Sequence, residues 1–198
     1  IGLENVRLIE TPGNPVVYGD WLHGGTTPSG TDVPTILFYG HYDVQPVDPV
    51  ELWDSPPFEA TVRDGEIYAR GAADDKGQVF MHLKAIEAHL KKTGKLPVNI
   101  RVVIEGEEEV GSDHLDDFIK ANKASLSADV VVISDSAMFD RGVPSICYGL
   151  RGLVYFQIDL RGSNSDLHSG IFGGSVANPA MVLAQLLAKM RDTSGPIK

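Results

Sequence analysis

Acidic and histidine side chains gather at four places in the sequence, each near the end of a predicted β-strand. They are His41 with Asp43, Asp74 with Asp75, the three glutamates at 107–109, and Asp135. In open α/β sheets, ligands bind beyond the carboxyl ends of the strands, so we expect these groups to face one site. One imidazole and three or four carboxylates make a ligand set that suits Zn²⁺ or Mn²⁺.

The first two clusters also fit ordinary structural roles. Residues two apart in an extended chain point the same way, about 6.6 Å along the strand, so Asp43 is placed to brace the imidazole of His41. The same spacing suits a hydrogen-bonded pair on the surface. Asp75 fits the N-terminus of a helix, where capping and the helix dipole favour aspartate. Asp74 is then left in a glycine-flanked loop, where it can bind a ligand.

The glutamates and Asp135 have alternatives of the same kind. A run of charges is usually a solvated face, and a single aspartate after a strand is most often a turn residue. Here, however, the glutamates follow a strand predicted to be buried, and carboxylates brought close together repel one another unless a cation joins them. The four clusters together therefore indicate a divalent-metal site.

The sequence offers no rival chemistry. It has no Cys-x-x-Cys pair, no serine nucleophile elbow and no phosphate-binding glycine loop. Four further histidines are interpreted as structural or exposed, since we find no acidic cluster with them: His23, His82, His89 and His114.

Alternating strand and helix patterns must position these clusters. Short apolar and β-branched runs predict strands at 35–39, 66–69, 98–104 and 130–133. The last is a continuous apolar run, which is typical of a strand covered on both faces.

Helical spacing of apolar residues predicts a helix over 75–92, which Gly94 ends. Ser112 is expected to cap a second helix, whose inner face would include Leu115, Phe118 and Ile119. Strands that alternate with helices indicate an α/β domain with a largely parallel sheet.

The pattern changes near Gly149, where we place a domain boundary. Residues 153–160 alternate as a strand does, a glycine- and serine-rich loop occupies 162–174, and 178–190 is a strongly predicted helix. One strand and one helix are too little for an independent core. The chain is interpreted as an excerpt of a longer protein, because it begins in what looks like a strand and stops just after a helix.

The composition narrows the class of protein. The 198 residues are 42% hydrophobic and carry a formal net charge of −10, which disfavours nucleic acid and anionic membrane surfaces as partners. No run approaches the ~18 apolar residues of a membrane span. One cysteine, Cys147, and the absence of a signal-peptide pattern lead us to expect a cytoplasmic globular protein.

Five ordered motifs resemble a known family. They are Gly40-His41-Tyr42-Asp43-Val44-Gln45-Pro46, the run 70–77, Glu108-Glu109-Val110-Gly111-Ser112, Ser134-Asp135, and Asp166-Leu167-His168-Ser169-Gly170. The chain is similar to the co-catalytic zinc peptidases of peptidase family M20, which include carnosinase, aminoacylase, carboxypeptidase G and succinyl-diaminopimelate desuccinylase. It looks most like the carnosinase-type dipeptidase branch.

The resemblance implies a fold and a division of the chain. Residues 1–149 would form a zinc-exopeptidase-like catalytic domain with a largely parallel mixed sheet. This domain would lack the family's early helices and its late return segment. Residues 150–198 would begin an α+β domain that serves as lid and dimerisation surface.

The resemblance also implies residue roles. His41, Asp74, Glu109 and Asp135 would bind two divalent metal ions, with zinc expected and manganese or cobalt as alternatives. Two further roles would support the chemistry: Asp43 would orient His41, and Glu108 would be the general base. His168 would contact the substrate, and the peptide bond between Asp74 and Asp75 would be cis.

The expected activity is hydrolysis of the amide bond of a dipeptide or short peptide, in a homodimer joined through the lid domain. Alternatives are an N-acyl amino acid deacylase or desuccinylase of the same family, or a non-catalytic piece that retains only dimerisation. The family uses a further histidine ligand from a late segment, and no histidine follows His168. We therefore expect the 198-residue chain alone to bind metal weakly and to be inactive.

Overall fold

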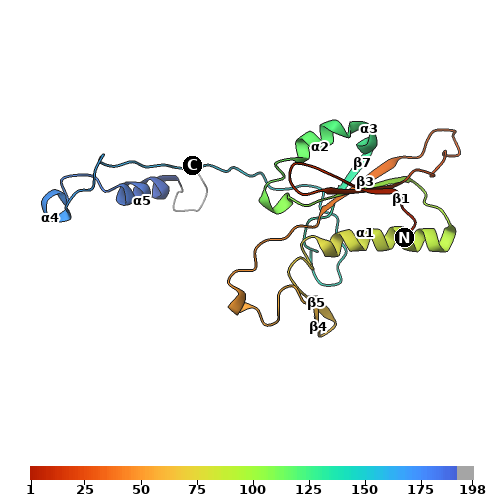
Figure 1. The fold of residues 1–198 in the computed structure, drawn as a ribbon, viewed down its shortest axis with the longest axis horizontal. Helices are drawn as coiled ribbons and strands as arrows, with labels where there is room; N and C mark the ends of the chain where they lie inside the picture. Colours follow the sequence, from red (N-terminus) through yellow and green to blue (C-terminus); the bar gives the residue numbers. More distant parts are fainter. Residues whose placement is uncertain (191–198) are drawn as a thin grey trace. The chain divides into compact units, whose positions relative to one another are not determined.

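The computed structural model describes residues 1–190 (Figure 1). The chain divides into two compact units, Ile1–Tyr148 and a second unit that begins at Gly149. No helix among the described residues is both long enough and apolar enough to cross a membrane.

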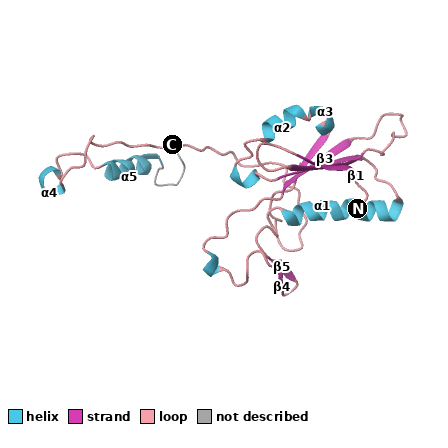
Figure 2. Ribbon diagram, in the orientation of Figure 1, coloured by secondary structure: helices cyan, strands magenta, loops and turns pink. Residues whose placement is uncertain are grey.

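A five-stranded mixed sheet forms the centre of the first unit (Figure 2). Its order is β1-β2-β6-β3-β7, from β1 (Glu4–Ile9), β2 (Val16–Trp21), β6 (Asn99–Glu105), β3 (Thr35–His41) and β7 (Val130–Ile133). β3 is parallel to both β6 and β7, whereas β2 is antiparallel to β1 and β6. Four of the five strands therefore run in the same direction, and the predicted α/β fold with a mostly parallel sheet is confirmed.

Helices cover both faces of this sheet (Figure 1). On one face α1 (Lys76–Thr93) packs through Ile86 against Ile100 and Val102 of β6. On the other face α2 (Leu115–Ala121) packs through Phe118 against Val103 of the same strand, and α3 (Lys123–Leu126) follows α2. Successive β6 side chains thus serve opposite cores, as the two-residue period of a strand requires.

Short elements complete the first unit. A hairpin pairs β4 (Thr61–Arg63) with β5 (Glu66–Tyr68), apart from the main sheet. Two 3-10 turns, η1 (Val50–Leu52) and η2 (Glu108–Val110), lie in the connecting loops.

The first helix follows the sequence prediction and the second departs from it. α1 ends at Gly94, which adopts φ 70° and donates its N–H to the carbonyl of Leu90. Ser112, by contrast, does not cap α2, whose N-cap is His114. The Ser112 hydroxyl instead donates to the buried carboxylate of Glu105, 2.9 Å away. Of the expected inner face, Phe118 is buried, but Ile119 is 45% exposed.

β7 is less buried than its apolar sequence predicts. Val130, Val131 and Ile133 are at least half exposed, although the strand was expected to be covered on both faces. β7 is one of the two edge strands and pairs only with β3 in the described sheet, so one side of it has no neighbouring strand.

The second unit contains α4 (Ser169–Phe172) and α5 (Pro179–Met190) among its described residues. α5 matches the predicted helix; Pro179 occupies its first turn, and the Asn178 side chain accepts the N–H of Ala180 at 2.9 Å. The strand predicted at 153–160 is absent, because a strand needs a hydrogen-bonding partner and none is present in the described part of this unit.

Candidate metal centre

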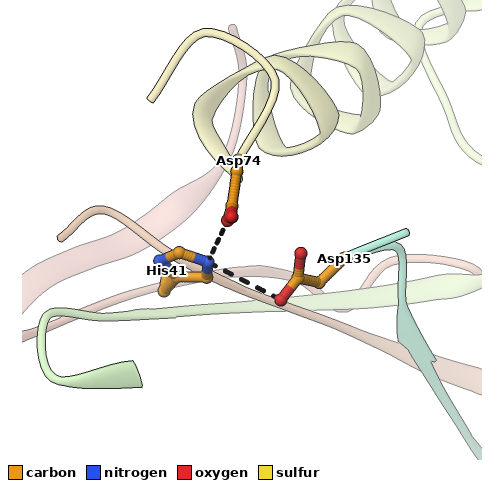
Figure 3. A group of neighbouring side chains, drawn as sticks. All are labelled: His41, Asp74 and Asp135. Carbon is orange, nitrogen blue, oxygen red and sulfur yellow. Dashed lines mark hydrogen bonds and ion pairs between the residues drawn. The ribbon is translucent and has the colours of Figure 1, made fainter. Parts of the chain in front are cut away.

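Three side chains from three separate segments converge beyond the ends of β3 and β7 (Figure 3). His41 is the last residue of β3, Asp74 precedes α1, and Asp135 follows β7. The Nε2 atom of His41 lies 3.0 Å from Asp74 Oδ1 and 3.7 Å from Asp135 Oδ2. All three potential ligand atoms lie within 4.8 Å of one another.

The sheet topology explains this convergence. β3 and β7 are parallel neighbours, so their carboxyl ends reach the same edge of the sheet. Asp74 approaches from the start of α1, which packs on β3. The predicted cis peptide bond between Asp74 and Asp75 is present.

The imidazole of His41 is fully buried and oriented by Asp43. Its Nδ1 atom lies 3.1 Å from the Asp43 carbonyl and 3.2 Å from the Asp43 carboxylate. With Nδ1 protonated, Nε2 presents a lone pair toward Asp74 and Asp135, which is the state that a metal ligand needs. Burial lowers the pKa of His41, but the Asp43 carbonyl and the charges of Glu108 and Asp43 outweigh it, so the pKa is raised overall.

Glu108 stands beside the cluster without joining it. Its Oε2 atom lies 3.9 Å from His41 Nε2. Burial raises the pKa of Glu108; the positive charge of His41 opposes this effect, and the negative charges of Asp135 and Glu109 add to it. A carboxyl group with a raised pKa is suited to proton transfer near neutral pH.

The other two glutamates of the run point to different partners. Glu107 pairs with His114, whose Nδ1 lies 2.9 Å from its carboxylate. The Glu109 carboxylate accepts a hydrogen bond from the Gln45 side chain at 2.7 Å. The backbone N–H of Glu109 donates to the Asp43 carboxylate at 2.9 Å. The structure therefore brings His41, Asp74 and Asp135 together and does not include the Glu109 carboxylate in that group.

His168 belongs to the second unit. It is the N-cap of α4, and its Nδ1 accepts the N–H of Gly170 at 3.0 Å. In the neutral ring the proton is therefore on Nε2, which makes that atom a hydrogen-bond donor.

Three side chains have partners that the sequence did not lead us to expect. His23 and His114 have acidic partners, Glu4 and Glu107, although no such partner was expected. Asp75 occupies the N-cap position of α1, yet its side chain caps nothing. Its Oδ2 atom instead accepts the backbone N–H of His41 at 3.2 Å. The contact between Asp75 and His41 joins residues 34 apart in sequence, so no local pattern indicates it.

The donor set fits a divalent cation. An imidazole nitrogen and two carboxylate oxygens are the donor types that zinc accepts in catalytic sites. Without a cation, carboxylates this close together repel one another, so a positive ion stabilises the arrangement.

A family model described as peptidase family M20/M25/M40 matches residues 37–193. The chain belongs to this family. The match includes the whole cluster, Glu108 and His168, so the motif resemblance seen in the sequence is confirmed.

Named relatives and solved structures agree with the family. The chain is 39% identical over its full length to the Cys-Gly metallodipeptidase dug1 of Schizosaccharomyces pombe, of which it covers 41%. Over 82% of its length it is 41% identical to the human Beta-Ala-His dipeptidase, of which it covers 32%.

Its fold matches that of an M20 family metallo-carboxypeptidase, Sso-CP2 from Sulfolobus solfataricus. The TM-score is 0.77 at 37% identity, over the whole chain and 43% of that structure. The chain thus spans less than half the length of these relatives.

Proposed function

We propose that the protein is a dinuclear metallopeptidase that hydrolyses the amide bond of dipeptides or short peptides. The observation that carries this proposal is the convergence of His41, Asp74 and Asp135, with Glu108 3.9 Å from His41, in a chain of this family. The names of the relatives support a dipeptide substrate.

The residues that would hold the metal ions are His41, Asp74, Glu109 and Asp135. Zinc is the proposed metal, since its preferred donors are nitrogen and carboxylate oxygen. When bound, such ions supply Lewis acidity that lowers the pKa of water toward neutrality and polarises the amide carbonyl. Support for Glu109 comes from the family motif, because its carboxylate contacts Gln45 in the structure.

The chain's own residues then move the protons. Glu108 accepts a proton from the attacking water and returns it to the nitrogen of the leaving amine, so one carboxyl serves as base and then as acid. Asp43 holds the Nδ1 side of His41 and keeps Nε2 directed at the cluster. His168 donates its Nε2–H to the oxygen on which negative charge develops.

The activity is tested on the natural protein that contains this chain, loaded with zinc or with manganese. We expect turnover of dipeptides such as Cys-Gly and β-Ala-His, and its loss with a chelator. Preference for N-acyl amino acids over every dipeptide would instead favour a deacylase or desuccinylase. A protein that binds no metal by elemental analysis would exclude both enzymes and favour a non-catalytic role.

Two further parts of the proposal concern the whole protein. We propose a homodimer formed through the domain that begins after Gly149, and a cytoplasmic location. The acidic net charge of −10 supports neither nucleic acid nor an anionic membrane surface as a partner.

A further inference from the structure

We propose that Asp75 is a positioning residue. Its buried carboxylate fixes the backbone at His41 and so holds two proposed metal ligands, His41 and Asp74, in place. The inference rests on the proposed function in one respect, namely that the cluster of His41, Asp74 and Asp135 binds metal. It adds a residue that neither binds the metal nor touches the substrate.

The burial of Asp75 is unusual for a residue at a helix start. The side chain is 1% exposed and is among the largest fully buried side chains of the described chain. An aspartate that only capped α1 would accept an N–H from the first turn, and Asp75 makes no such bond. A capping role therefore does not account for it.

The carboxylate reaches across to the neighbouring strand instead. Its Oδ2 atom accepts the N–H of His41 at 3.2 Å. Asp75 is also the immediate neighbour of Asp74, whose Oδ1 lies 3.0 Å from His41 Nε2. The Asp75 side chain thus links the segment that carries Asp74 to the segment that carries His41.

Gly40 provides the space for this contact. A Cβ atom at Gly40 would lie 2.7 Å from Asp75 Oδ2 and 2.4 Å from Val79 Cγ2. A larger side chain at position 40 would clash with the Asp75 carboxylate, so the hydrogen bond between Asp75 and the His41 N–H depends on glycine at this position.

The arrangement has a cost that a purely structural role does not explain. The second oxygen of Asp75, Oδ1, is buried without a hydrogen-bond partner in the structure. Burying a carboxylate with one oxygen unpaired destabilises a fold. Such local conflicts are expected at functional sites.

The test measures metal affinity in the natural protein that contains this chain, by competition with a chromophoric zinc chelator, and melting temperature in parallel. Asp75→Ala should weaken zinc binding by about 10–100-fold, as loss of groups that orient metal ligands typically does. Asp75→Asn, whose amide oxygen can still accept the His41 N–H, should remain within about threefold of native affinity.

Asp20→Asn is the matched control. Asp20 is another buried aspartate of the sheet, 5% exposed, and it accepts hydrogen bonds from Tyr18 and Asn5 rather than from a ligand segment. This variant should lower the melting temperature but leave zinc affinity unchanged. An equal loss of affinity in Asp20→Asn would mean general loosening and would overturn the proposal.

Two other results would also overturn it. The first is native zinc affinity in Asp75→Ala. If that variant does not fold, Gly40→Ala replaces it, because the added methyl clashes with the Asp75 carboxylate as well as with Val79, without removing the carboxylate. The second is a native protein that binds no zinc, which would overturn the proposed function as well. Zinc binding by native protein and by Asp75→Ala alike would overturn only the role of Asp75.

Discussion

At the scale of single residues, the site separates groups that the sequence places side by side. Glu107, Glu108 and Glu109 are consecutive, yet they face His114, the metal-ligand cluster and Gln45 respectively. The 3-10 turn η2 rotates successive side chains away from one another, so neighbours in sequence reach different partners. Three like charges thereby avoid close contact, and only one remains beside His41.

This separation predicts distinct outcomes for two matched variants. Glu108→Gln should lower kcat by about 10²–10⁴-fold, because an amide cannot take up the proton of the attacking water. Its metal content by elemental analysis should stay native, since Glu108 lies outside the cluster of potential ligand atoms. Glu107→Gln, which loses only a partner of His114, should keep native kcat. Loss of metal in Glu108→Gln would place that residue among the ligands instead.

At the scale of elements, the sequence predicted those features that depend on local pattern. The helix over 75–92 was predicted to within a residue at each end, because apolar spacing and Gly94 are local signals. The strand expected at 153–160 and the burial expected for β7 were wrong, because both depend on neighbours that local pattern does not specify.

The same distinction applies to the site. His41 and Asp135 were expected at strand ends, and the structure brings them together because the parallel strands β3 and β7 deliver their ends to one edge. Asp74 joins them from the start of α1, and the binding of metal by the three residues stays a prediction. The contacts of Asp75 with His41, and of Ser112 with Glu105, were missed. In both cases the side chain was expected to cap a helix. It instead forms a hydrogen bond with a buried residue outside that helix.

The hydrogen bond from Ser112 to Glu105 lies next to the turn that carries Glu108, and its contribution to stability can be tested. Glu105 is 2% exposed and accepts hydrogen bonds from both Ser112 and Tyr39. Ser112→Ala should lower the free energy of unfolding by about 1–3 kcal/mol, because a hydrogen bond to a buried carboxylate is lost. Urea unfolding measures this. Ser29→Ala, in an exposed hydroxyl cluster, should change stability by less than about 0.5 kcal/mol; equal effects would show that Glu105 does not need Ser112.

A second element-scale prediction concerns His82, which joins α1 to the loop after β7. Its Nε2 lies 2.7 Å from the Ser134 hydroxyl, its ring packs on Phe38, and burial lowers its pKa. Because the folded-state pKa of His82 is below the unfolded value of about 6.5, the burial of its neutral ring contributes fully to stability above that pH. This contribution is lost as the pH falls below the unfolded-state pKa and through the folded-state pKa.

The measurement compares how steeply the unfolding free energy depends on pH in two metal-free proteins. Between pH 7 and pH 5, the unfolding free energy of the native protein should fall more steeply than that of His82→Gln. Taking the difference between the two proteins cancels the opposite contribution of His41, whose pKa is raised. His89→Gln, at an exposed position of α1, controls for a glutamine on the same helix. Parallel pH profiles for native protein and His82→Gln would contradict the prediction.

At the scale of the whole molecule, the groups proposed for catalysis are divided between the two units. The metal-ligand cluster and Glu108 belong to Ile1–Tyr148, whereas His168 belongs to the unit that begins at Gly149. The cluster is rich in carboxylates, which cannot donate to a developing oxyanion when they are ionised. The N–H of Gly170 occupies Nδ1 of His168, so the neutral ring carries its proton on Nε2, and this is the donor that we propose for the oxyanion.

The second unit also has the apolar surface that a dimer would use. Met181, Leu186 and Leu187 of α5 are between 36% and 61% exposed, and exposed apolar side chains of this kind are available for contact with a partner. A twofold interface between these units would bring residues of one subunit to the other. We therefore predict that His168 acts on the active site of the partner subunit.

Subunit mixing of the natural protein tests this. His168→Ala and Glu108→Ala homodimers should each be nearly inactive. In their heterodimer, one site combines an intact Glu108 with an intact His168 from the neighbouring subunit, so action in trans restores activity. Random pairing at equal amounts makes half of the dimers mixed, each with one complete site, so about a quarter of native activity should return.

The reciprocal mixture distinguishes the two cases by its total activity, which should be about a quarter of native in trans, from native homodimers alone, and about half of native in cis. Native subunits paired with the double variant His168→Ala/Glu108→Ala contain no complete site if His168 acts in trans, because the native Glu108 faces a neighbour without the histidine. If His168 serves its own subunit, this mixed dimer keeps one working site, and the first mixture recovers nothing. Measuring the activity of both mixtures, after mass spectrometry confirms exchange, therefore decides which subunit His168 serves.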